Sequence, residues 1–163
     1  WIKAVKRKLI VENNINFEVG LLGEDMDWNY QVIFNASTTE FIDEPMIAYR
    51  QREGSITSTH TLKNLVDFVY ILEKWSNRIT NDIKDEKLKI ALYGSLAKYY
   101  SNLLVVYSRL SDSKKKIYIK RIKNLGWLLK YGMSQRPQMI YKIYRIAGFR
   151  LTIIALKIFD RIK

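Results

Sequence analysis

The stretch Leu62–Trp75, LKNLVDFVYILEKW, decides the fold class, because apolar residues recur at helical spacing on most of its sides. Such a segment is typical of a helix buried among other helices. Farther along the chain, apolar residues recur at intervals of three or four: Leu88, Leu92, Leu96, Tyr99, Leu103, Val106 and Leu110. This spacing predicts a long helix with one apolar seam. The sequence therefore predicts a helical region from residue 61 onward.

The helical pattern continues to the end of the chain. SDSKKK, residues 111–116, predicts the start of another helix, with Ser111 or Ser113 as its N-cap. Pro137 predicts the start of a further helix, and Gly148 divides it from the last one. On that last helix one side is apolar: Leu151, Ile154, Ala155, Ile158 and Ile162. We expect residues 61–163 to form a bundle of about four or five helices.

The first 60 residues predict shorter elements, separated by loops. Residues 1–15 predict a helix that ends near ENN, and DMDWNYQVIFNAS, residues 25–37, predicts a second helix with one apolar stripe. Between them the segment INFEVGLLGED predicts a loop, because Gly20 and Gly23 interrupt regular structure. Met46–Tyr49 is a short apolar run after Pro45, which predicts a strand.

Composition excludes several kinds of site. The 163 residues include no Cys and one His, so disulfides, thiolate zinc sites, Cys nucleophiles and two-His zinc sites are excluded. No run approaches the roughly 18 apolar residues of a membrane-spanning helix, and no signal peptide is visible. Because the first residue is Trp1, we expect the chain to be part of a longer protein.

Positive charge is concentrated in the last 50 residues. Residues 114–163 hold 14 Lys and Arg against one acid, Asp160, which gives this segment a net charge of +13. The whole chain has a net charge of +12, so its entire positive surplus lies in these residues. A localised basic surface suggests an anionic partner, although a solvated basic face on helices is the plainer explanation. The same residues interleave aromatic side chains, as in a surface-bound membrane anchor. Bundle packing is the alternative for the aromatics, and no sequence signature supports nucleic-acid binding.

Three carboxylates, Glu24, Asp25 and Asp27, lie within four positions in GEDMDW. They suit the first turn of a helix on stability grounds alone. Asp25-Met26-Asp27 also matches the letters of a D-x-D metal site, but no nucleotide-binding unit of strands and helices precedes it, so no residue here is assigned as a metal ligand. The third interpretation joins the cluster to its neighbours.

INFEVGLLGEDMDW, followed about 20 residues later by EPMIAYRQREGSIT, resembles the second half of the catalytic domain of family 2 glycosyltransferases. The resemblance covers about residues 1–60 and includes the lead-in KRKLIVENNINFEVG. The helical tail is similar to the C-terminal extension of bacterial capsule and exopolysaccharide members. The resemblance implies a mostly α chain with two parts. Residues 1–60 would be the C-terminal remnant of a GT-A α/β domain, with short strands and active-site loops. Residues 61–163 would be a helical extension that is basic from residue 114.

The resemblance implies roles for particular residues. Asp25 matches the general base of an inverting transfer, and Glu24 would orient the site or contact the acceptor. Arg50 and Arg52 match the part of the pattern near the donor phosphates, where guanidinium groups bind oxygens in a forked geometry. A salt bridge to Glu44 or Glu53 is the alternative for Arg50. Two hydroxyl residues complete the substrate-binding set but could equally cap the next helix: Ser55 and Thr57.

The resemblance also implies partners that only a longer protein could bind. These are a nucleotide-sugar donor, a polysaccharide or lipid-linked acceptor, and a divalent metal, Mg²⁺ or Mn²⁺, whose D-x-D ligands are absent from this chain. The chain alone is expected to be inactive. We expect a cytoplasmic enzyme, peripheral at the inner face of the cell membrane through residues 114–163. The alternative function is a non-catalytic helical module that binds a membrane surface or another anionic partner.

Overall fold

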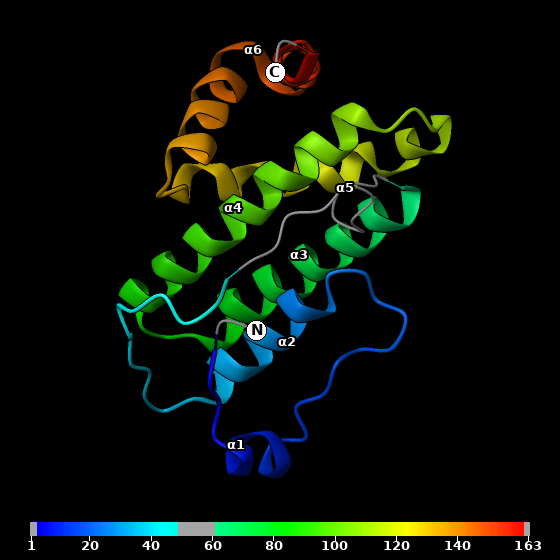
Figure 1. Cartoon of the computed structure of the whole chain (residues 1–163). Coiled ribbons are helices and arrows are strands. Elements are labelled where there is room, and N and C mark those ends of the chain that lie inside the picture. Colours follow the sequence, from blue (N-terminus) through cyan, green and yellow to red (C-terminus); the bar gives the residue numbers. More distant parts are fainter. Residues whose placement is uncertain (1–2, 49–60, 162–163) are drawn as a thin grey trace. The chain divides into compact units, whose positions relative to one another are not determined.

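The computed structural model describes residues 3–48 and 61–161, and every regular element within these ranges is a helix (Figure 1). The prediction of a mostly α chain is therefore confirmed. The chain divides into two compact units, residues 1–59 and 60–163. Each unit has its own helices and its own local contacts.

The first unit contains α1 (Arg7–Glu12) and α2 (Glu24–Asn35). The helix predicted over residues 1–15 is shorter than expected at its start but ends where the ENN segment begins. There the N–H of Asn13 bonds to the carbonyl of Leu9 at 3.3 Å, and Asn14 adopts a left-handed φ of 48°. A left-handed residue cannot continue a right-handed helix, and Asn is among the residues that tolerate this conformation. The second predicted helix is confirmed as α2.

No strand forms within residues 36–48, so the prediction of a strand at 46–49 is wrong for Met46–Ala48, while Tyr49 lies outside the described residues. Met46 and Ile47 are exposed, at 69% and 51%. The apolar run has no neighbouring strand in the described part of the first unit. A strand needs such a partner to satisfy its backbone N–H and C=O groups. The apolar composition of the run was therefore not enough to predict a strand.

In the second unit the central element is α4 (Glu86–Arg109). It packs against α3 (Leu62–Asp82), the 3₁₀ helix η3 (Gly126–Tyr131) and α6 (Gln135–Arg161) (Figure 1). Between α4 and η3 the chain forms η2 (Ser113–Tyr118) and α5 (Ile119–Asn124). The helical region predicted from residue 61 onward is thus a set of helices arranged around α4.

Side chains fix where these helices begin. Thr61 and Asn64 form a reciprocal capping box at α3, in which the Thr61 hydroxyl accepts from the Asn64 N–H at 3.2 Å. The Asp85 carboxylate accepts from the N–H of Leu88 at 3.0 Å and caps α4.

Two predicted helix starts need correction. The cap after α4 is neither Ser111 nor Ser113: the Asp112 carboxylate accepts from the N–H of Lys114 at 2.8 Å and opens a 3₁₀ turn. A charged acceptor is stronger than a hydroxyl, so the acid between the two serines is the cap. Pro137 is the third residue of α6 rather than its first, and its missing N–H costs nothing in a first turn.

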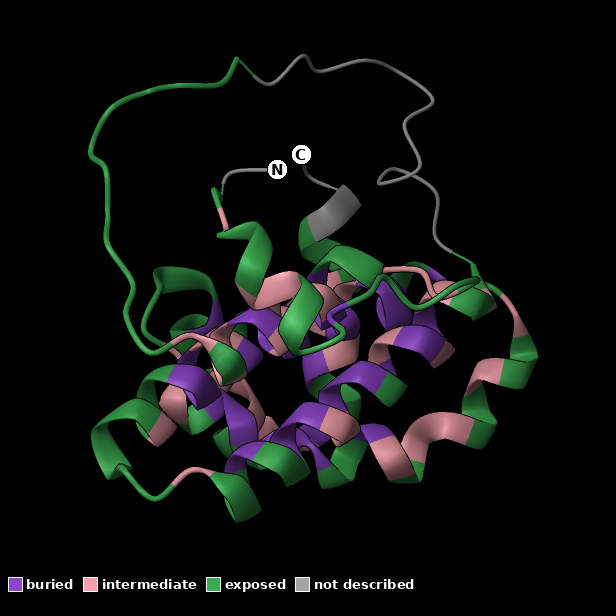
Figure 2. Cartoon of the chain, turned by 90° about the horizontal axis from the view of Figure 1, so that it is seen from below, coloured by how far each residue is buried: buried purple, intermediate pink, exposed green. Residues whose placement is uncertain are grey.

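The predicted apolar seam of α4 lies mostly inside the second unit. Leu92, Leu96, Leu103, Val106 and Leu110 are buried, whereas Leu88, near the start of the helix, is 44% exposed. Figure 2 shows buried residues on the inner faces of the helices and exposed residues on their outer faces. Tyr99 is half-buried, so the three-four spacing identified the packed face at five of its seven positions.

The division of the last helical segment at Gly148 is confirmed. Gly148 has φ 71° and ψ 179°, which interrupts α6, and the chain changes direction there (Figure 1). This conformation is essentially restricted to glycine. The Thr152 hydroxyl donates to the Gly148 carbonyl at 2.8 Å, so the first turn after the kink is tied to it.

Tyr100 gives a test of the packing around α4. Its hydroxyl donates to the Ile122 carbonyl at 2.8 Å, and burial, followed by neighbouring Tyr144, raises its pKa well above the usual 10.0. Because the folded state holds the Tyr100 proton more tightly than the unfolded state does, the protonated hydroxyl contributes to stability below pH 10. This contribution is lost as the pH rises further. We expect Tyr100→Phe to lower the free energy of unfolding by about 1 kcal/mol at neutral pH. In urea titrations the difference in free energy of unfolding between the unaltered chain and Tyr100→Phe should narrow above pH 10. A difference that stays constant would contradict the buried, hydrogen-bonded position of the Tyr100 hydroxyl.

Candidate functional site

The candidate site lies in the first unit, at the turn that leads into α2. Gly20 and Gly23 have φ values of 80° and 86°, and Gly23 is the left-handed N-cap of α2. Residues with side chains rarely adopt these values, so the two glycines allow the chain to turn sharply into the helix. The acidic cluster begins at the next residue, in the first turn of α2, where the helix dipole favours negative charge.

The three acids of the cluster do not share one environment. Glu24 and Asp25 are exposed, whereas Asp27 is completely buried. One oxygen of Asp25 accepts a hydrogen bond from the N–H of Met26 at 2.9 Å. The two carboxylates expected to act on an acceptor therefore face solvent, and the third is a structural residue of the helix start.

Asp27 belongs to a polar network that holds the preceding loop on α2. The amide of Gln31 donates to the Asp27 carboxylate at 2.8 Å and to the Asn16 carbonyl at 3.0 Å. Alongside, Phe17 stacks on Trp28 with ring centroids 5.3 Å apart and planes 9° apart. The loop and the first turns of α2 are thus fixed to each other, which positions the turn that carries Asp25.

The sequence analysis missed Gln31. Its position four residues after Asp27 places both side chains on one face of a helix, which was the available signal. The partner Asn16 lies in a loop, so nothing in the spacing could have identified it.

The geometry does not bring Asp25 and Asp27 together as a metal site, because one is exposed and the other is buried against Gln31. Across residues 3–48 and 61–161 no group of three or more His, Asp or Glu side chains could hold a metal ion. The remaining predicted site residues, Arg50, Arg52, Ser55 and Thr57, lie outside the described residues. Their relation to Asp25 stays a prediction.

The basic tail of the second unit contributes several aromatic rings to contacts with α4. Three of its aromatic rings contact tyrosines of α4: the ring centroids of Trp127 and Tyr131 each lie 4.9 Å from that of Tyr93, and the centroid of Phe149 lies 5.6 Å from that of Tyr107. The packing alternative is therefore correct for these rings. None of the helices in the described ranges has the length and apolar character needed to cross a bilayer.

Several apolar side chains of α6 are exposed. Ile146 is 85% exposed before the kink. Beyond it four apolar residues are more than half exposed: Leu151, Ile154, Ile158 and Phe159. Of the predicted apolar side of the last helix, Leu151, Ile154 and Ile158 are exposed and Ala155 is half-buried, while Ile162 lies outside the described residues.

Comparison with known proteins gives one informative likeness. Over 64 residues, or 39% of the chain, the sequence is 30% identical to the uncharacterized glycosyltransferase YibD of Escherichia coli strain K12. The match covers 19% of that protein, so the chain spans about a fifth of this relative's length. No family model matches the chain, and no solved structure matches it. The likeness supports a relationship to glycosyltransferases.

Proposed function

We propose that the chain is the acceptor-side part of an inverting glycosyltransferase of the family 2 type, in which residues 1–60 complete a GT-A catalytic domain. The whole protein would transfer a sugar from a nucleotide donor to a polysaccharide or lipid-linked acceptor. The observation that carries the proposal is the exposed Asp25 carboxylate at the first turn of α2, on a turn fixed by the contacts of Asp27, Gln31 and Asn16. The likeness to a glycosyltransferase supports the class of reaction.

The proposed chemistry uses Asp25 as a general base. As an acceptor hydroxyl attacks the anomeric carbon, its proton passes to the Asp25 carboxylate. The new carbon–oxygen bond forms while the bond to the nucleotide diphosphate breaks on the opposite face, which inverts the configuration. Glu24, the adjacent exposed acid, would contact the acceptor or orient the site.

Arg50, Arg52, Ser55 and Thr57 are proposed to bind the donor. Guanidinium groups suit this task because they stay charged and pair with phosphate oxygens through two hydrogen bonds. In the whole protein a Mg²⁺ or Mn²⁺ ion would neutralise the diphosphate, with its ligands outside this chain.

We also propose that residues 114–163 hold the enzyme at the inner face of the cell membrane, close to lipid-linked acceptors. Their net charge of +13 favours an anionic surface over a neutral one. The exposed aliphatic residues of α6 favour a membrane over nucleic acid, because a membrane offers a hydrocarbon layer to bury them and nucleic acid does not. The same observation is the basis of the second candidate function, a non-catalytic module that binds membranes.

The stereochemistry of the product tests the proposed function. The full-length protein would be incubated with a panel of nucleoside diphosphate sugars and acceptor glycans, and the anomeric configuration of each product read by NMR. We expect release of the nucleoside diphosphate and a product with inverted configuration. Retention of configuration would contradict the mechanism, and absence of transfer with every donor and acceptor would favour the non-catalytic module.

A further inference from the structure

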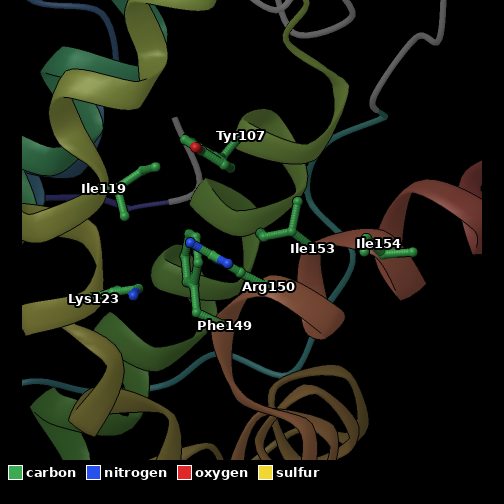
Figure 3. A pocket seen from close by; sticks show the side chains of 7 residues that line it. All are labelled: Tyr107, Ile119, Lys123, Phe149, Arg150, Ile153 and Ile154. Atoms are coloured by element: carbon green, nitrogen blue, oxygen red, sulfur yellow. The ribbon is translucent and has the colours of Figure 1, made fainter.

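A hollow of about 320 Å³ lies in the second unit, between α4, α5 and α6 (Figure 3). Its wall is largely apolar and includes Tyr107 from α4 and Phe149 and Ile153 from α6. Two cations also line it, Lys123 from α5 and Arg150 from α6. Because Phe149 and Arg150 come directly after the kink at Gly148, the change of direction of α6 helps to form the hollow.

The cations of the hollow have no acidic partner in the described part of the chain. Lys123 Nζ lies 5.7 Å from the centre of the Phe149 ring, and both cations are exposed. Nearby, Lys115 Nζ donates to the carbonyls of Tyr107 and Leu110 at the end of α4. Burial, and then repulsion by Lys157 and Lys116, lowers the pKa of Lys115. Positive charge thus accumulates around this end of α4, which favours an anion there.

An exposed apolar face continues from the hollow along α6. Leu151, Ile154 and Ile158 are 56%, 52% and 54% exposed and follow one another at intervals of three and four, so they share one face of the helix. Ile154 also lines the hollow, which makes the two surfaces continuous. On the opposite side Phe149 and Thr152 are buried and hold the helix in place.

We propose that the hollow binds the phosphate of an anionic membrane lipid between Lys123 and Arg150, while the hydrocarbon chains lie over Leu151, Ile154 and Ile158. A free phosphate would use the cations alone and would leave the apolar face exposed to water. An amphiphile with a charged head and an apolar tail matches both surfaces at once. The proposal refines the membrane attachment proposed above and is independent of the role of Asp25.

Vesicle co-sedimentation of the full 163-residue chain tests the two parts separately. Vesicles of phosphatidylcholine with phosphatidylglycerol would be compared with phosphatidylcholine alone, at several salt concentrations. Lys123→Gln/Arg150→Gln should weaken binding to the anionic vesicles roughly 25-fold, since each cation near the surface contributes about fivefold. The matched control is Lys87→Gln/Lys98→Gln, which removes the same charge from exposed positions of α4 and should weaken binding much less.

The apolar face has its own pair of variants. Leu151→Ser/Ile158→Ser should weaken binding at least tenfold, because these side chains would leave the hydrocarbon. The control Leu88→Ser/Ile90→Ser removes two aliphatic side chains that are each 44% exposed on α4, and it should bind as the unaltered chain does. All eight positions are exposed, so circular dichroism should show unchanged helix content in every variant.

The outcomes separate this proposal from the proposed function. If the unaltered chain binds anionic vesicles but each variant loses no more vesicle binding than its control, the proposed lipid site is wrong. The general attachment of residues 114–163 to the membrane then stands. If the chain binds no vesicles even at low salt, both are wrong, and the proposed chemistry of Asp25 is unaffected. If inorganic phosphate displaces the chain more than sodium chloride of equal ionic strength, and the apolar variants have no effect, the ligand is a soluble phosphate and the proposal fails.

Discussion

Replacing Asp25 by Asn in the full-length protein should lower the rate of glycosyl transfer by about 100- to 10,000-fold, the range that a positioned general base contributes. The amide is nearly the same size as the carboxylate but cannot accept the proton of the attacking hydroxyl. Because proton transfer occurs in the transition state, the loss should fall on kcat, with little change in KM for the donor. Steady-state kinetics with the donor and acceptor identified in the product assay would measure both constants.

Asp43→Asn is the matched control for this prediction. Asp43 is an exposed acid of the same unit, in the segment after α2, so the substitution makes the same change of charge outside the first turn of α2. We expect its kcat to lie close to that of the unaltered protein. If Asp25→Asn also stays within about twofold of the unaltered kcat, the carboxylate is not the base, since even the weaker such catalysts contribute more.

The largest effect on stability is expected in the seam of α4. Leu103 is completely buried and lies on α4, the helix that packs against α3, η3 and α6. Leu103→Ala should lower the free energy of unfolding by about 2–5 kcal/mol, because it removes apolar contacts and leaves a cavity. Urea unfolding of the 163-residue chain, followed by circular dichroism at 25 °C, would measure the change.

Leu88→Ala makes the same substitution on the same helix at a position that is 44% exposed. It should cost less than about 1 kcal/mol, because surface substitutions have small effects and Ala favours the helix. Equal losses for the two variants would contradict the burial pattern of α4 and, with it, the packing of the second unit.

Periodicity predicted the helices because each of them packs one face against a neighbour. In the predicted seam of α4, Leu88 in the first turn is exposed and Tyr99 is half-buried, whereas the other five residues are buried. The short segments were harder to predict. At Met46–Ala48 the composition favours a strand, but the described part of that unit offers no pairing partner. After α4 the choice between Ser111, Asp112 and Ser113 as the cap depended on a single hydrogen bond.

The candidate site was predictable in part. The motif placed Glu24 and Asp25 on the first turn of a helix, and the structure shows both exposed there. The sequence could not show that Asp27 is fully buried, because burial depends on which neighbouring segments fold over it. In the tail, alternating cations and aromatic rings fit both a membrane anchor and a packed bundle. Only tertiary contacts show that Trp127 and Phe149 contact tyrosine rings of α4 while aliphatic residues of α6 are exposed.

The position of the Asp25 carboxylate in a ternary complex tests the central claim most directly. A crystal structure of the full-length protein with a non-transferable donor analogue and an acceptor would measure the distance from this carboxylate to the acceptor hydroxyl. We predict about 2.6–3.2 Å, with the hydroxyl facing the anomeric carbon and the diphosphate on the opposite side next to Arg50 and Arg52. A carboxylate turned away from the acceptor, with another side chain within hydrogen-bond distance of that hydroxyl, would contradict the account.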